Sequence, residues 1–130
     1  DLRRLIRRQR QMCIRDRVFK TLVLHGDKIG YFVCCLPVDQ ELDLKKVARA
    51  SGNKHAEMIP MKDLLGVTGY IRGGCSPIGM KKKFPTFIDE TCELFDEMAV
   101  SAGVRGMQII INPQTLIKFT DATLADLTTY

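Results

Sequence analysis

The spacing of apolar and polar positions divides the chain into short β-strands and helices. Val18–His25 alternates apolar and polar residues, as a half-buried strand does. Gly26-Asp27-Lys28 supplies turn residues, and Ile29–Leu36 is a second, more apolar run that ends at Pro37. The two runs therefore predict a β-hairpin.

The same periodicities predict the remaining elements. Leu42–Ala50 has apolar residues at helical spacing and stops at Gly52, and Asn112 marks the start of a final helix that runs to about Phe119. We expect a short helix over Pro60–Leu65 and strands at His55–Ile59, Tyr70-Ile71, Phe84–Ile88, Glu97–Val100 and Met107–Ile111. Because hairpins alternate with helices, the order predicts an α/β fold, a mixed, partly barrel-like β-sheet with packed helices.

The excess positive charge lies at the start of the chain. Of the 20 Lys and Arg and 15 Asp and Glu in 130 residues, residues 1–17 hold seven arginines and two aspartates, so residues 18–130 are neutral overall. The string Gln11–Arg17 resembles adapter sequence that recurs, read as protein, at the ends of translated metagenome contigs. We interpret residues 1–17 as a non-native or disordered basic segment and residues 18–130 as the domain. The alternative is a basic arm that binds RNA phosphates.

The sequence does not indicate a membrane protein, a secreted protein or a metal-binding protein. The longest apolar runs fall far short of the ~20 residues of a membrane helix, and the basic start lacks the apolar run of a signal peptide. The cysteines form no C-x-x-C pair, and His25 and His55 are not spaced to complete a zinc site. Adjacent Cys34 and Cys35 point to opposite faces of a strand and do not easily bridge. We expect a soluble cytoplasmic protein with reduced thiols, no metal and no cofactor.

The stretch Thr68–Gly79 is the most informative part of the chain. It holds four glycines and one proline in twelve residues, and glycine lets a ligand approach the main chain closely. The bend Gly73–Ser76 would present N–H groups to the oxyanion of an ester under attack; the alternative is a tight structural loop. The lysine run Lys81–Lys83 that follows is either a solvated face or a phosphate contact.

Five blocks of sequence stand in order and in register between Val18 and Asp126. They are Val18-Phe19-Lys20-Thr21-Leu22-Val23; Leu42-Asp43-Leu44-Lys45-Lys46-Val47-Ala48; Thr68-Gly69-Tyr70 with Gly73-Gly74, Ser76-Pro77 and Gly79; Lys81-Lys82 with Pro85-Thr86 and Ile88-Asp89; and Val100-Ser101-Ala102-Gly103 with Arg105-Gly106. Together they resemble the YbaK/EbsC family of aminoacyl-tRNA deacylases, whose members carry a YbaK-like aminoacyl-tRNA editing domain.

The resemblance implies an enzyme of translation, a trans-editing hydrolase that deacylates mischarged Cys-tRNA(Pro). In the family's mechanism the substrate thiolate attacks its own ester carbonyl and releases tRNA through a cyclic thiolactone, a lyase-like step. Alternatives are a deacylase of another mischarged tRNA such as Ala-tRNA(Pro), with Phe32, Cys34 and Tyr70 shaping the pocket, or a non-catalytic module that binds tRNA or prolyl-tRNA synthetase.

Carried over residue by residue, the resemblance implies that Lys20, Gly73 and Gly74 are the catalytic positions. The Lys20 ammonium would hold the terminal ribose or phosphate, or offset charge on the ester oxygen. The substrate-binding candidates are Thr21, Ser76, Lys81, Lys82 and Ser101. Cys75 has no histidine base beside it in the sequence, so we expect it to pack rather than react.

The chain departs from the family at its start. Family members have a further portion of roughly helix-strand-helix character before the Val18 strand, and the arginine-rich residues 1–17 stand in its place here. The resemblance therefore implies a chain truncated at its N-terminus.

Overall fold

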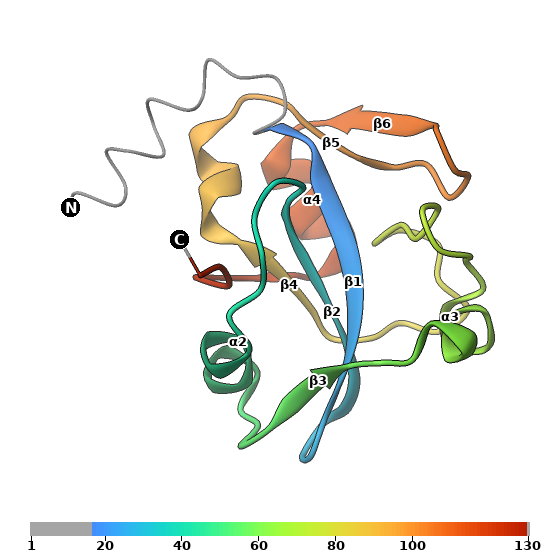
Figure 1. The fold of residues 1–130 in the computed structure, drawn as a ribbon. Helices are drawn as coiled ribbons and strands as arrows, with labels where there is room; N and C mark the ends of the chain where they lie inside the picture. The colour runs from blue at the N-terminus through green and yellow to red at the C-terminus, as the bar shows by residue number, and fades with distance from the viewer. Residues whose placement is uncertain (1–16, 130) are drawn as a thin grey trace.

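The computed structural model describes residues 17–129 (Figure 1). Residues 1–16 and Tyr130 lie outside the described residues, so the basic segment expected over residues 1–17 falls there except for Arg17.

Within residues 17–129, seven strands form two sheets. The larger sheet has the order β3-β1-β2-β4-β7, and β5 and β6 form a separate hairpin. The bounds are β1 Phe19–Gly26, β2 Gly30–Pro37, β3 Ala56–Met58, β4 Thr86–Asp89, β5 Met98–Ser101, β6 Gln108–Ile111 and β7 Thr123–Ala125. β1 is antiparallel to β2 and β3, whereas β4 runs parallel to β2 and β7. A parallel bridge from Val18 to Ala99 brings β5 against the start of β1. The mixed, partly barrel-like α/β fold is confirmed.

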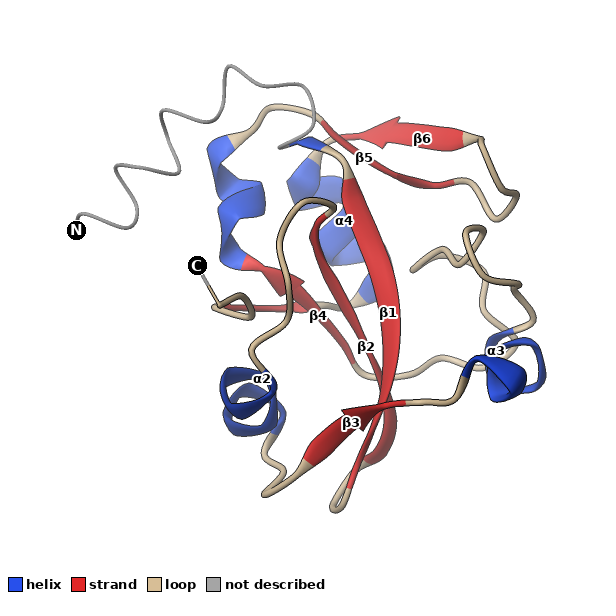
Figure 2. Cartoon of the chain, viewed as in Figure 1, coloured by secondary structure: helices blue, strands red, loops and turns tan. Residues whose placement is uncertain are grey.

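In the part of the chain that the structure describes, three α-helices and one 3-10 helix pack on the sheets (Figure 2). They are α2 Leu44–Ser51, α3 Met61–Thr68, α4 Pro113–Thr120 and η3 Glu90–Leu94. The side chain of Asp43 accepts hydrogen bonds from two N–H groups of α2, and Asn112 caps α4 in the same way. Gly52 ends α2 with φ 77°, as the sequence predicts. None of the helices in residues 17–129 has the length and apolar character to cross a membrane.

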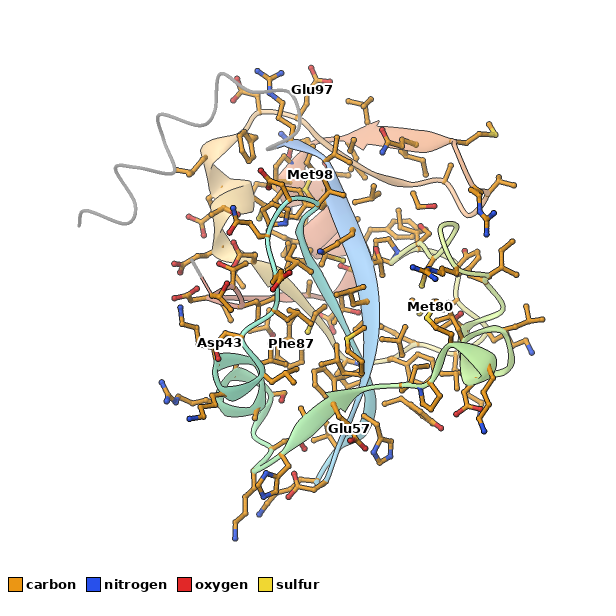
Figure 3. All side chains as sticks on the ribbon, viewed as in Figure 1. Asp43, Glu57, Met80, Phe87, Glu97 and Met98 are labelled. Atoms are coloured by element: carbon orange, nitrogen blue, oxygen red, sulfur yellow. The ribbon has the colours of Figure 1, made fainter. Side chains whose placement is uncertain are left out.

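Strand β2 separates two parts of the core. On one face Val33 and Cys35 pack with η3, β5 and Leu116 of α4. On the other face Phe32 and Cys34 pack with Val47 of α2. Phe87 of β4 belongs to the same cluster and is labelled in Figure 3. A strand buried on both faces explains the continuous apolar run of Ile29–Leu36. It also confirms that the two adjacent cysteines point in opposite directions.

The structure corrects three details of the expected element order. Tyr70-Ile71 is not a strand, because Gly69 ends α3 in a left-handed conformation and the chain continues as a loop. Helix α3 runs to Thr68 instead of Leu65, and the Thr68 hydroxyl donates a hydrogen bond to the Leu64 carbonyl at 2.8 Å. The short η3 and β7 have no counterpart in the prediction, since β7 owes its conformation to pairing with distant β4.

Candidate active site

A pocket of about 340 Å³ opens beside the first half of β1. The loop after α3 and the β5–β6 hairpin lie on the same side of β1 (Figure 1) and complete its walls. The lining residues are Val18, Phe19, Lys20, Thr21, Leu22 and Val38 from the β1–β2 region, Gly73 and Cys75 from the loop, and Ser101, Gly106, Met107 and Gln108 from the hairpin.

The main chain of β1 presents a free edge to this pocket. β3 pairs only with Leu24–Gly26 and the bridge to β5 is at Val18, so between these points β1 pairs with β2 alone. The Val38 N–H donates to the Val18 carbonyl at 2.8 Å, and alternation along an antiparallel pair then directs the main-chain groups of even-numbered β1 residues to β2. Odd-numbered residues point away, as the bond from the Ile59 N–H to the Val23 carbonyl shows. The N–H and C=O of Thr21 therefore face the pocket edge.

Lys20 brings a positive charge to the pocket. It is half-buried, and it lies across from Leu36 in the hairpin register. Phe19, its neighbour, is buried in the core on the opposite face, as the alternation predicts. Within residues 17–129 no acidic side chain lies within ion-pair distance of the Lys20 ammonium and no group accepts a hydrogen bond from it. As far as the described residues are concerned, the charge is therefore available to a ligand.

The glycine pair shapes a tight turn at the mouth of the pocket. The Gly74 N–H donates to the Ile71 carbonyl at 3.0 Å, and Gly73 has φ 84° at the third position of this four-residue turn, where type II geometry favours glycine. Gly73 lines the pocket, but Gly74 is buried against the hairpin, where an added Cβ would lie 3.3 Å from the Arg105 nitrogen. The N–H of Gly74, an expected oxyanion donor, is engaged in the turn.

The loop is fastened to its surroundings by Tyr70. The Tyr70 hydroxyl donates to the Ile78 carbonyl, and its N–H donates to the Thr68 hydroxyl at 3.0 Å. A Cβ on Gly79 would lie 2.9 Å from the Tyr70 hydroxyl, and one on Gly103 would lie 3.0 Å from the ring. Both glycines are thus needed for the ring to fit between the loop and the hairpin.

The described residues that line the pocket provide no activated protein nucleophile. Burial raises the pKa of Cys75 to about 11, so the thiol is neutral at physiological pH. None of the lining residues is a His, Asp or Glu, and His25 lies near the far end of β1 against the Tyr31 ring. In residues 17–129 no three His, Cys, Asp or Glu side chains cluster in a way that could hold a metal ion.

The structure brings some of the substrate-binding candidates to the pocket. Thr21 and Ser101 line it; the Thr21 hydroxyl lies 3.7 Å from the Cys35 sulfur, and the Ser101 hydroxyl accepts from the Gly103 N–H at 3.1 Å. Ser76 is buried and accepts from the Ile78 N–H at 3.2 Å.

The two lysine candidates lie beside the loop and not among the residues that line this pocket. Lys81 is exposed, and its stem lies over Gly69, where an added Cβ would be 3.2 Å from the Lys81 Cγ. Lys82 is exposed and lines a neighbouring pocket.

One further expectation, about the residues that shape the pocket, changes. Phe32 and Cys34 are fully buried between the sheet and α2, and Tyr70 holds the loop, so the structure does not place them in the lining. Met107 and Gln108 of the hairpin line the pocket instead. The periodicity predicts their strand but carries no signal that the hairpin returns beside β1.

The comparisons with known proteins agree with this geometry. The aminoacyl-tRNA editing domain family matches residues 9–119. A relative from Enterococcus faecalis, named "Putative Cys-tRNA(Pro)/Cys-tRNA(Cys) deacylase EbsC", is 54% identical over 115 residues, which cover 88% of this chain and 70% of the relative.

Solved structures share the fold. One described as a "putative trans-editing enzyme for prolyl tRNA synthetase" matches with a TM-score of 0.79 and 25% identity over 94% of this chain and 76% of its own. A designed scaffold for epitope grafting matches with a TM-score of 0.83 and 26% identity over 89% of this chain and 76% of its own. The family match and the 54% identical relative place the chain in a family: it belongs to the aminoacyl-tRNA editing domain family.

Proposed function

We propose that this protein is a trans-editing hydrolase that cleaves the ester between cysteine and the 3′ end of mischarged tRNA(Pro). The observation that carries the proposal is the half-buried Lys20 ammonium, without an acidic partner in residues 17–129, in a pocket that it shares with the Gly73 turn. The family and the name of the Enterococcus faecalis relative support the same reaction.

The chemistry assigned to the protein is positioning and charge stabilisation. The thiolate of the substrate cysteine attacks its own carbonyl carbon, so that a C–S bond forms and the bond to the ribose oxygen breaks. That oxygen keeps the electron pair and takes up a proton, and water then opens the four-membered thiolactone to free cysteine. Lys20 offsets the negative charge that develops on the oxygens of the ester, and the Thr21 N–H on the free edge of β1 is a second donor.

This division of labour fits the lining of the pocket. A protein nucleophile needs an adjacent base, and the described lining residues include none. Cys75 is protonated at neutral pH because burial raises its pKa. The attacking sulfur therefore belongs to the substrate, and the protein holds the ester in a geometry that favours ring closure.

A comparison of charged tRNAs tests the proposal. We expect Cys-tRNA(Pro) to be deacylated at least about ten-fold faster than in buffer. Ser-tRNA(Pro) should react much more slowly, since a hydroxyl is a poorer nucleophile than a thiolate. Rapid hydrolysis of Ala-tRNA(Pro), which has no thiol, would contradict the substrate-assisted step. Folded protein that binds tRNA without deacylating it would establish the non-catalytic alternative.

Three finer assignments belong to the same proposal. Prolyl-tRNA synthetase is the partner that would present the mischarged tRNA, and the cytoplasm is the compartment in which that tRNA forms. Residues 18–130 are the editing domain, and residues 1–17 are a separate basic segment. Deleting residues 1–17 should leave tRNA affinity and folding unchanged, whereas loss of a genuine RNA-binding arm would weaken binding and flatten its salt dependence.

A further inference from the structure

A second pocket lies next to the candidate active site. It has a volume of about 130 Å³, and Pro77, Ile78 and Met80 of the loop between α3 and β4 form part of its wall; Figure 3 labels Met80 on this loop. Cys75 lines the first pocket and Pro77 the second. Since two residues span at most about 7 Å of chain, the two pockets share this loop as a common wall.

The second pocket is bordered by an exposed aromatic ring. Phe119 of α4 is 69% exposed, although Leu116 and Thr120 of the same helix are buried. Phe84, partly buried, lies among the apolar residues of the pocket wall. An exposed phenyl ring on an apolar floor offers a flat face for stacking with a nucleobase.

Positive charge borders the same ring. Lys82 and Lys83 line the pocket with Phe119. Lys82 has no acidic partner within residues 17–129, and Lys83 has only Asp121, 3.8 Å away with both side chains largely exposed. Such an exposed pair contributes little, so both ammonium groups can contact phosphates. Aromatic faces interleaved with cations are the usual means of binding single-stranded nucleic acid.

We propose that Phe119, Lys82 and Lys83 bind the unpaired nucleotides that precede the aminoacylated 3′-terminal nucleoside of the tRNA. One base stacks on the Phe119 ring, and the two lysines contact the adjoining phosphates. The proposal rests on the proposed function, because the bound RNA is the strand whose aminoacyl end enters the pocket of Lys20. This strand crosses the loop that the two pockets share.

Binding of a short RNA tests the proposal without requiring hydrolysis. The probe is an uncharged, fluorescently labelled single-stranded RNA with the tRNA 3′ end, followed by anisotropy. The Phe119→Ala variant should bind this RNA roughly 5- to 150-fold more weakly than the wild type, because it loses one stacked base. Phe119→Tyr should bind as the wild type does. Leu65→Ala is the matched control, because Leu65 is 55% exposed on α3 and lines neither pocket.

Two further measurements separate stacking and charge from other roles. Lys82→Gln should reduce the slope of log affinity against log salt by about 0.7, the value for one phosphate contact on a single strand. Phe119→Leu, which keeps an apolar side chain, should bind as weakly as Phe119→Ala; full affinity would overturn the stacking role.

The outcome for this surface is independent of the outcome for the reaction. Wild-type affinity in Phe119→Ala overturns the inference even if Cys-tRNA(Pro) is deacylated. The same result with weakened binding to prolyl-tRNA synthetase would assign the ring to a protein partner and also overturn it. Conversely, RNA binding that depends on Phe119 in a protein that does not deacylate Cys-tRNA(Pro) would sustain the inference and refute the proposed function.

Discussion

The Arg105 guanidinium donates two hydrogen bonds to the carbonyl of Arg72, at 2.9 Å from Nη2 and 3.3 Å from Nε. Arg72 immediately precedes Gly73 in the turn at the pocket mouth, and Arg105 lies between β5 and β6. One side chain therefore fastens the glycine turn to the hairpin that forms the opposite wall.

Replacing Arg105 should loosen the turn without unfolding the protein. We expect Arg105→Ala to lower kcat/KM for Cys-tRNA(Pro) about five-fold, the effect of losing ~1 kcal/mol of hydrogen bonding at an exposed site. Arg105→Lys should behave similarly, because an ammonium does not reproduce the two parallel donors. Arg49→Ala on α2 removes an exposed charge elsewhere and is the control. Full activity in Arg105→Ala would show that the contact does not position the turn.

Gly73 should tolerate a methyl group far less well than Gly66 does. Gly73 has φ 84°, where a Cβ costs ~1–2 kcal/mol, and the Cβ would lie 3.1 Å from the Arg105 Nε. Gly66 lies inside α3 with no atom within 4 Å of an added Cβ, so Gly66→Ala should stabilise the protein by up to about 1 kcal/mol. Urea denaturation of both variants checks the pair. Equal stability of Gly73→Ala and the wild type would contradict the assigned turn.

The buried thiols predict how stability changes in alkaline solution. Burial raises the pKa of Cys35 and Cys92 to about 12 and that of Cys75 to about 11, from 9.0. Below pH 9 these thiols are protonated in both the native and the unfolded protein, and their contribution is constant. As the pH rises from 9, the unfolded chain ionises first, so the free energy of unfolding falls.

The difference between wild type and Cys75→Ala isolates one thiol. Without Cys75, the decrease in the free energy of unfolding between pH 9 and 11 should be smaller, because one raised pKa is removed. Urea denaturation in the presence of a reductant, repeated at each pH, gives the two curves. Parallel curves over this range would show that the native thiol ionises as readily as the unfolded one.

Local sequence signals predicted the elements that carry the site, but not how they meet. The β1–β2 hairpin follows from alternation around Gly26-Asp27-Lys28, and the caps Gly52 and Asn112 mark helix ends that the structure confirms. These signals act between residues close in sequence. The side of β1 on which Gln108 lies depends on long-range packing of the β5–β6 hairpin, for which periodicity gives no information.

The glycine loop illustrates the same limit. The sequence indicated that the glycines permit close approach of the main chain, and Gly73 does line the pocket. It did not indicate that Gly74 packs against the hairpin, because the contact is with Arg105, about thirty residues further along the chain. Likewise, the exposure of Phe119 next to Lys82 follows only once α4 packs beside the loop.

The central claim is that Lys20 stabilises the developing charge while the substrate supplies the sulfur. The most direct measurement compares Lys20→Ala and Cys75→Ala, side by side, for single-turnover deacylation of Cys-tRNA(Pro), with thermal unfolding to show that both variants are folded. Loss of a positioned charge in a sheltered pocket predicts a rate roughly 100- to 1000-fold lower for Lys20→Ala. Cys75→Ala should retain most of the wild-type rate. An inactive Cys75→Ala beside an active Lys20→Ala would instead mean that the protein's own thiol attacks the ester.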